Sequence, residues 1–145
     1  MIEQLEGRQL LSAASPLNIV ISVPFNTSSG VLTVFGARDV MLTAQADGSI
    51  DVLADGQSYH AVAWGNEGQG VVPICEVDVL ATAPGSNLVV LNTNDAHPLT
   101  AVIDTGVGSD ALIVTGTGTA DITFDGGPGR DYLFNFDANA AITVV

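Results

Sequence analysis

The stretch DTGVGSDALIVTGTGTADITFDGGPGRDYLF, residues 104–134, decides the fold of this chain. Its two ends, DTGVGSDALI (104–113) and DGGPGRDYLF (125–134), share Asp, Gly, Gly, Asp and Leu at matching offsets, 21 residues apart. Between them TGTGTADITF (115–124) keeps the same rhythm with its acidic residue displaced. A unit of turn, strand, turn and strand every 21 residues is what one coil of a two-sided solenoid needs, with alternate turns stacked in a column.

Related signals extend from this stretch towards the N-terminus. PGSNLVVL (84–91) is a looser copy with Asn87 in place of the Asp, and DGSIDVLA (47–54) is a fainter one. Short runs rich in Val, Ile, Leu and Thr alternate with Gly, Asp, Asn and Pro turns, and their starts fall about ten residues apart. The expected strands are residues 19–23, 31–35, 40–44, 50–53, 60–64, 77–81, 88–91, 101–103, 111–114, 121–124, 132–134 and 142–145.

These signals predict an all-β protein, a parallel β-helix or β-roll-like solenoid, with a β-sandwich as the alternative. We expect one domain over residues 17–145, with its characteristic turns at 104–134. The expected core or core-edge residues include the aromatic side chains Trp64, Phe35, Phe124 and Phe134, together with Leu133. The only cysteine, Cys75, lies in the apolar stretch VVPICEV and is expected to be a small core residue.

The charge balance restricts the partners. Of 145 residues, 16 are Asp or Glu and three are Arg, with no Lys, for a formal net charge of -13. Such a chain repels phosphate backbones and anionic lipid, which argues against nucleic acid and membranes as partners, and it attracts cations. No apolar run approaches the length of a membrane-spanning helix. The alternative is that the acidity only keeps the surface soluble.

GGPGRDYLF (126–134) matches every fixed position of the nonapeptide G-G-x-G-x-D-x-U-x, and TGVGSDALI (105–113) matches it with Thr105 at the first glycine. The chain therefore resembles the RTX, or hemolysin-type, calcium-binding repeats. The resemblance implies calcium between turns of adjacent coils, with Asp110 and Asp131 as carboxylate ligands and Leu112 and Leu133 turned into the core. Carbonyl ligands would come from Gly106, Gly108, Gly127 and Gly129.

Glycine permits the tight backbone that turns carbonyls inward, and calcium takes six to eight hard oxygen ligands at about 2.3–2.6 Å. Asp104 and Asp125 precede the motif and are expected as outer-shell acids. Two carboxylates make a sparse site, so we expect a weak affinity, in the ~10⁻⁴–10⁻³ M range of extracellular modules. The alternative is a solenoid whose turns keep the glycines without the metal.

The segment IEQLEGRQLLSA (2–13) resembles the LEPR-XLL segment found near the start of exported proteins of planctomycetes and other bacteria. Its matching residues are Leu5, Glu6, Arg8, Leu10 and Leu11, whereas Gly7 stands where that family often has another residue. The resemblance implies that residues 1–16 are an export-associated segment; the alternative is a plain amphipathic opening turn. Residues 32–57 are similar to the degenerate repeats that precede hemolysin-type arrays, with Gly36 and Asp39 in the G-x-x-x-D turn.

Together these patterns predict a secreted or cell-surface module with a non-enzymatic structural or adhesive role, whose partners are calcium ions and other surface or matrix components. A metal-free scaffold or spacer is the alternative, and a fragment of a carbohydrate-active β-helix enzyme is a remote one. No Lys is present, and no Ser-His-Asp order or H-E-x-x-H spacing supports a catalytic site. His60 is expected to be a partly buried strand residue, and a pair of glycosidase carboxylates among the 16 acids stays open.

Overall fold

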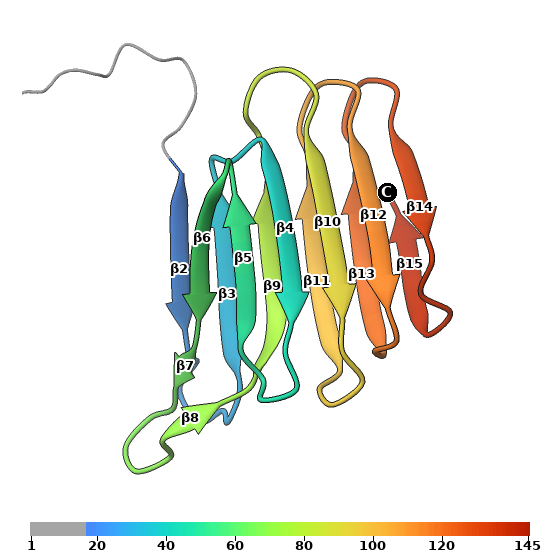
Figure 1. The fold of residues 1–145 in the computed structure, drawn as a ribbon. Helices are drawn as coiled ribbons and strands as arrows, with labels where there is room; N and C mark the ends of the chain where they lie inside the picture. Colours follow the sequence, from blue (N-terminus) through green and yellow to red (C-terminus); the bar gives the residue numbers. More distant parts are fainter. Residues whose placement is uncertain (1–16) are drawn as a thin grey trace, which may run out of the picture.

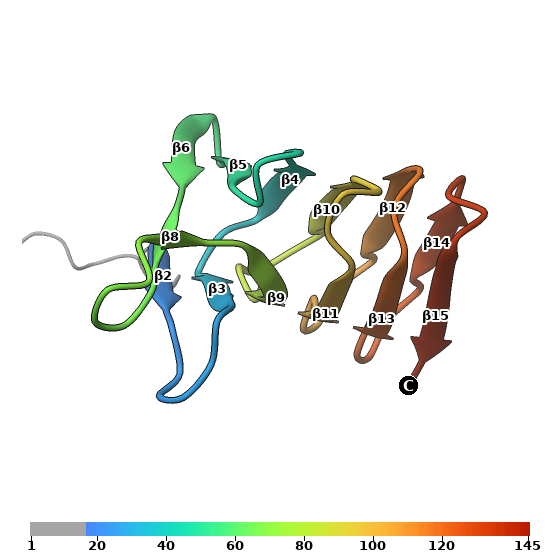
Figure 2. The ribbon, with the colours of Figure 1, turned by 90° about the horizontal axis from the view of Figure 1, so that it is seen from below.

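Two facing sheets form the molecule (Figures 1 and 2). A computed structural model describes residues 17–145, which contain only β-strands and loops. One sheet, here called the front sheet, has the order β14 (Tyr132–Asn135), β12 (Ala111–Gly116), β10 (Leu88–Thr93), β4 (Asp39–Ala44), β5 (Ile50–Ala54) and β6 (Gln57–Ala61). The other, the back sheet, has the order β15 (Ala140–Val144), β13 (Ala120–Asp125), β11 (Leu99–Asp104), β9 (Ile74–Leu80), β3 (Gly30–Phe35) and β2 (Asn18–Ser22).

From β9 onward the chain alternates between the two sheets, and each strand pairs in parallel with the strand of the next coil. Asp104 lies opposite Asp125, and Ala111 opposite Tyr132, so the 21-residue repeat is the length of one coil. The coil of β3 and β4 continues both sheets in parallel with β9 and β10. The fold is therefore a parallel β-solenoid of about three turns, as the repeat predicted, and not the alternative sandwich.

The core lies between the sheets because apolar and polar residues alternate along the strands. In β12, Leu112 and Val114 point inward and are fully buried, and in β13 the same is true of Ile122. Parallel register places each inward residue on the one before, so Leu112 packs on Val89 and below Leu133. The predicted inward turn of Leu112 is confirmed.

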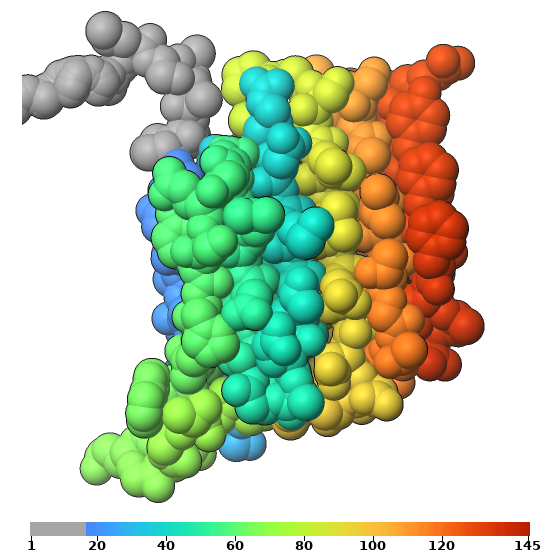
Figure 3. Space-filling model, in the orientation of Figure 1, coloured from blue at the N-terminus to red at the C-terminus, as the bar shows by residue number. Residues whose placement is uncertain are grey.

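The N-terminal part departs from this pattern. β2 pairs antiparallel with β3, and β4, β5 and β6 form an antiparallel meander. A two-residue turn, Asp55–Gly56, joins β5 to β6 with both residues at positive φ, as tight hairpins require. A further hairpin, β7 (Ala63–Trp64) and β8 (Val71–Val72), projects beyond the ends of the two sheets (Figures 1 and 3). Residues 47–54, a faint repeat in the sequence, therefore form no coil turn of their own.

Two predictions of core or core-edge residues, for Trp64 and Phe134, were wrong. Trp64 is 70% exposed because it lies on the projecting hairpin, and Phe134 is 46% exposed because it points away from the core on the outer face of β14. Leu133 faces inward but is 39% exposed, since β14 is the outermost strand of its sheet. Phe124 is buried as predicted, and Phe35 is half-buried.

Cys75 was predicted as a core residue, but it is half-buried and stands at a bulge. Gly30 pairs with Ile74 and Val31 with Glu76, so Cys75 is the extra residue of β9 that has no partner on β3. Burial raises the pKa of the Cys75 thiol above its ordinary value of 9.0.

Within residues 17–145 no helix long and apolar enough to cross a membrane is present.

Candidate functional site

Three turns lie one above the next along one edge of the solenoid, where the chain passes from the back sheet to the front sheet (Figure 1). They are residues 81–87, 105–110 and 126–131, here called the turn column. The register of the following strands, Leu88 with Ala111 and Ala111 with Tyr132, aligns Asn87, Asp110 and Asp131. The turn at 117–119 lies along the opposite edge, as the sequence repeat predicted.

The glycines let these turns touch along the solenoid axis. Gly127 has a φ of 67°, and a Cβ on it would overlap the carbonyl oxygen of Gly106. A Cβ on Gly129 would likewise overlap the carbonyl oxygen of Gly108, which shares a parallel β-bridge with Gly129. The carbonyls of Gly106 and Gly108 therefore point towards the neighbouring turn, as calcium ligation between coils would require. In this structure they face backbone, and Gly108 N–H donates to Pro128 O at 3.2 Å.

A ladder of side-chain acceptors runs along the column. The Asp110 Oδ1 atom accepts hydrogen bonds from the Asn87 backbone N–H at 2.7 Å and from Asn87 Nδ2 at 3.1 Å. One coil on, Asp131 Oδ1 accepts from the Asp110 backbone N–H at 3.1 Å. Each Asp thus caps the backbone amide of the residue before it in the column. This role was not apparent in the sequence.

Two buried oxygens in the column, Asp110 Oδ2 and Asn87 Oδ1, have no hydrogen-bond partner among residues 17–145. Both residues are almost completely buried, and Asn87 Nδ2 is held by Thr105 O at 2.9 Å and Gly85 O at 3.2 Å. A buried acceptor without a donor costs about 1–3 kcal/mol, so a cation or a water molecule beside these atoms would be stabilised.

Asp104 and Asp125 stand at the ends of β11 and β13, where each closes the start of its own turn. Asp104 Oδ1 accepts from Gly106 N–H and Asp125 Oδ1 from Gly127 N–H, both at 2.9 Å. These hydrogen bonds are local Asx turns. They use one oxygen of each carboxylate and leave the predicted outer-shell role of both residues untested.

The donor set of the column is mixed. Among residues 17–145 no group of three or more His, Cys, Asp or Glu side chains is placed to hold a metal. A calcium ion here would therefore combine Asp110 and Asp131 carboxylates with amide and backbone carbonyl oxygens, a ligand type that calcium accepts. The two unpartnered oxygens are of the type that such an ion takes as ligands, whereas the close contact between turns 105–110 and 126–131 would have to loosen to admit one.

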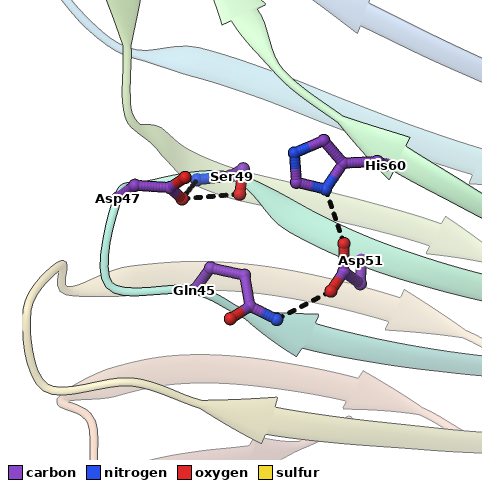
Figure 4. A network of polar contacts seen from close by, with 5 residues as sticks. All are labelled: Gln45, Asp47, Ser49, Asp51 and His60. Atoms are coloured by element: carbon purple, nitrogen blue, oxygen red, sulfur yellow. Dashed lines mark hydrogen bonds and ion pairs between the residues drawn. The ribbon is translucent and has the colours of Figure 1, made fainter.

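A second polar cluster lies on the outer face of the front sheet, in the antiparallel part (Figure 4). His60 Nδ1 is 2.6 Å from Asp51 Oδ1, and Gln45 Nε2 donates to Asp51 Oδ2 at 2.7 Å. The β5–β6 register places Asp51 opposite His60 beside a surface pocket of about 420 Å³. His60 is exposed, so its predicted partial burial was wrong. The DG turn at 55–56 was the sequence signal for this hairpin.

Asp47 belongs to the same region. The Ser49 hydroxyl donates to Asp47 Oδ1 at 2.6 Å and the Ser49 backbone N–H at 2.9 Å. These hydrogen bonds favour the carboxylate and hold the pKa of Asp47 below its ordinary value of 3.8.

Along the edge opposite the turn column, the buried Asp137 accepts a hydrogen bond from the Thr93 hydroxyl. Thr93 Oγ1 in turn accepts from Gly118 N–H at 2.8 Å, which ties three successive loops together. Asp137 Oδ1 also accepts from Asn139 N–H at 2.9 Å. A buried Asp therefore holds the turns along each edge of the solenoid, Asp110 on one edge and Asp137 on the other.

The parallel coils, the stacked glycine turns and the inward-facing strands define the class of protein, a short β-solenoid with acidic turns. No known family model matches the chain, and no curated protein or solved structure matches it either. The RTX resemblance stays a hypothesis from residues 104–134. The LEPR-XLL resemblance and the export-associated segment lie outside the described residues.

Proposed function

We propose that this chain is a non-enzymatic structural module of an exported or cell-surface protein, and that its turn column binds calcium weakly. The observation that carries the proposal is that two buried oxygens, Asp110 Oδ2 and Asn87 Oδ1, accept no hydrogen bond within the described part of the chain. The net charge of -13 and the match of residues 126–134 to the nonapeptide support the same ion.

Calcium would act by drawing adjacent turns together. Asp110 and Asp131 follow each other in the column, and a cation between them would offset the repulsion of two carboxylates. Ion binding would then be coupled to the rigidity of the coils. In the low-calcium cytoplasm the column would be looser than outside the cell. The partners would be calcium ions and further components of a surface or matrix.

The Asp51–His60 pair has residue types that serve in catalysis, yet the role proposed for it is structural. The His60 side chain is 58% and the Asp51 side chain 51% exposed to water, and the pair joins two neighbouring strands of one hairpin. Catalytic groups are more often desolvated and poised in a cleft.

A metal-free scaffold is the second candidate function, and the acceptor ladder favours it. Asp110 Oδ1 and Asp131 Oδ1 each already accept a backbone N–H, so their carboxylates stabilise the turns without an ion. In this case the residues of the nonapeptide pattern would serve only to form the tight turns. A water molecule would donate a hydrogen bond to Asp110 Oδ2.

Calorimetric titration of calcium into the metal-free chain separates the two candidates. The test variant is Asp110→Asn, which keeps the Oδ1 acceptor and removes the carboxylate. The matched control is Asp121→Asn, which removes the same charge from an exposed position of β13. Saturable binding at about 10⁻⁴–10⁻³ M that weakens at least about tenfold in Asp110→Asn alone supports the calcium module.

Equal weakening in both variants would mean that calcium only screens the surface charge. Absence of saturable heat at millimolar calcium, with circular dichroism already that of folded β structure, would overturn the calcium proposal in favour of the metal-free scaffold. Magnesium serves as the cation control, because it demands octahedral geometry and dehydrates reluctantly.

A further inference from the structure

The two outer faces of the solenoid differ in charge. The strands of the back sheet point a set of acids away from the core: Glu76, Asp78, Asp104, Asp121 and Asp125. Strands β10, β12 and β14 of the front sheet contain no charged residue at all. The side of the front sheet that points away from the core is here called the front face (Figure 3). It is the side on which this acidic chain can approach another surface with little charge repulsion.

Apolar side chains cross the front face in one row. The register of the parallel strands and of the β4–β5 hairpin aligns Phe134, Ile113, Val90, Met41 and Leu53. Met41 is 43% and Leu53 41% exposed, although both are apolar. A neighbouring coil on either side would lengthen this face without covering it, because coils add to a sheet edge to edge. An apolar row of this kind is a surface that association would bury.

At one side of the front face the row passes over a depression. Its volume is about 140 Å³, and its lining includes Asp39, Met41, Leu53, Leu88 and Val90. An apolar cavity of about 150 Å³ can hold a benzene ring. The depression therefore has the size of one aromatic ring.

Two aromatic rings stand at the other side of the same face. Tyr132 is 45% and Phe134 46% exposed, and their ring centroids lie 6.5 Å apart with planes only 9° from parallel. Phe134 is in the row of Met41, and Tyr132 is in the row of Leu88 and Asp39. Three strand spacings, about 14 Å, separate β14 from β4. The rings are therefore too far away to fill the depression of their own molecule.

We propose that the front face packs on the front face of a second copy of this chain, with Tyr132 and Phe134 of each copy in the depression of the other. A two-fold axis parallel to the strands, between β10 and β12, brings β14 of one copy over β4 of the other. Phe134 then packs on Met41, and the Tyr132 hydroxyl donates to the exposed carboxylate of Asp39.

The arrangement of rings and depression is what selects a second copy as the occupant. The same chain supplies a ring of the right size, in the right row, at the spacing that a two-fold axis needs. The contact occurs twice, so association closes after two subunits. Both acidic back faces stay in water on the outside of the dimer. The inference does not rest on calcium binding.

Sedimentation equilibrium of the full chain tests the proposal over roughly a hundredfold range of concentration, because dimer formation follows mass action. We expect a reversible monomer–dimer equilibrium. Met41→Lys puts a charge into the depression, and Phe134→Glu removes a ring that fills it. Each variant should raise the dissociation constant by about tenfold or more. The matched controls are Val102→Lys and Val102→Glu, which make the same charge changes at a 45% exposed position of the back sheet and should leave the constant unchanged.

Mixing the two variants tests the geometry itself. A dimer of one Met41→Lys chain and one Phe134→Glu chain keeps one intact contact between rings and depression. In its second contact the new lysine lies opposite the new glutamate, and opposite charges attract. The equimolar mixture should therefore form dimers at concentrations where each variant alone is monomeric. Circular dichroism of both variants should match that of the unchanged chain, since both positions point away from the core.

A monomer at every concentration overturns the proposal. Oxidation of Met41 by hydrogen peroxide then shows what replaces it: fast oxidation means a free front face, and slow oxidation a face covered by another part of the same chain. Dimers that survive Met41→Lys and Phe134→Glu would place the interface elsewhere and overturn it as well. A mixture that stays monomeric would overturn the pairing of rings with the depression.

Discussion

The parallel coils of residues 74–145 and the N-terminal part of residues 18–72, where β2, β5 and β6 pair antiparallel, bury one continuous core by different strand pairings. The coils depend on stacked turns in which glycine backbones touch and an Asp caps the amide of the coil before it. The antiparallel part depends on hairpins such as Asp55–Gly56, which need no neighbouring coil. The difference teaches that a glycine in a coil turn is constrained by the neighbouring coil, whereas Gly56 in its hairpin turn has open space around it.

The largest expected effect separates the two kinds of glycine turn. Gly127→Ala should cost about 3 kcal/mol or more, because the new Cβ adds a clash with the Gly106 carbonyl to the strain of a positive φ. Gly56→Ala, with no atom within 4 Å, should cost only the backbone strain of about 1–2 kcal/mol. Urea unfolding followed by circular dichroism measures both, and equal losses would show that the turns do not pack closely.

The next comparison tests how far the core is closed along the coils. Leu112→Ala should cost about 2–5 kcal/mol, because Leu112 is fully buried between two coils. Leu133→Ala, at the same position of the next coil, should cost less than half as much, since Leu133 is partly exposed. Thermal unfolding of both variants is the measurement. If both variants lose the same stability, Leu133 is as well covered in solution as Leu112.

The Asp caps of the two regions differ in burial. Asp110→Ala should cost about 1–3 kcal/mol in metal-free protein, because it leaves the buried Asn87 N–H without an acceptor. Asp55 caps the Arg38 and Asp39 N–H groups at 3.0 and 2.9 Å in an exposed turn. Asp55→Gly keeps the positive φ, and water can replace its carboxylate, so we expect a loss below about 1 kcal/mol. Chemical denaturation measures both losses. A larger loss for Asp55→Gly than for Asp110→Ala would contradict the stabilising role given to the buried Asp110 cap.

The smallest effect is a pH dependence in the antiparallel part. The Ser49 hydrogen bonds lower the pKa of Asp47 in the folded state. Since the folded pKa lies below the unfolded one, the stabilisation is present above the ordinary value of 3.8 and is lost as the pH falls through the folded pKa. NMR titration of the Asp47 carboxyl should show this, and Ser49→Ala should return its pKa towards 3.8. A pKa unchanged by Ser49→Ala would contradict the assignment.

Sequence reasoning was most accurate where one repeat predicts the next. The 21-residue spacing of residues 104–134 predicted the coil length, and the nonapeptide resemblance predicted the inward turn of Leu112. The looser copy at 84–91 placed Asn87 at the position of the Asp. It was weakest in residues 47–64, where the faint copy at 47–54 forms no coil and the strands fold back on their neighbours. There the aromatic character of Trp64 predicted burial, although its place on a two-stranded hairpin exposes it.

The sequence by itself determined the β class, the coil period and the column of Gly–Asp turns, because alternation and turn geometry are local properties repeated along the chain. Only the tertiary structure decided which acceptor meets which donor. The Asn87–Asp110 and Asp110–Asp131 hydrogen bonds join residues 23 and 21 positions apart, and Asp51 meets His60 across a hairpin. It also decided which apolar residues lie at an end of the solenoid, because their exposure depends on the neighbouring coil and not on their own side chains.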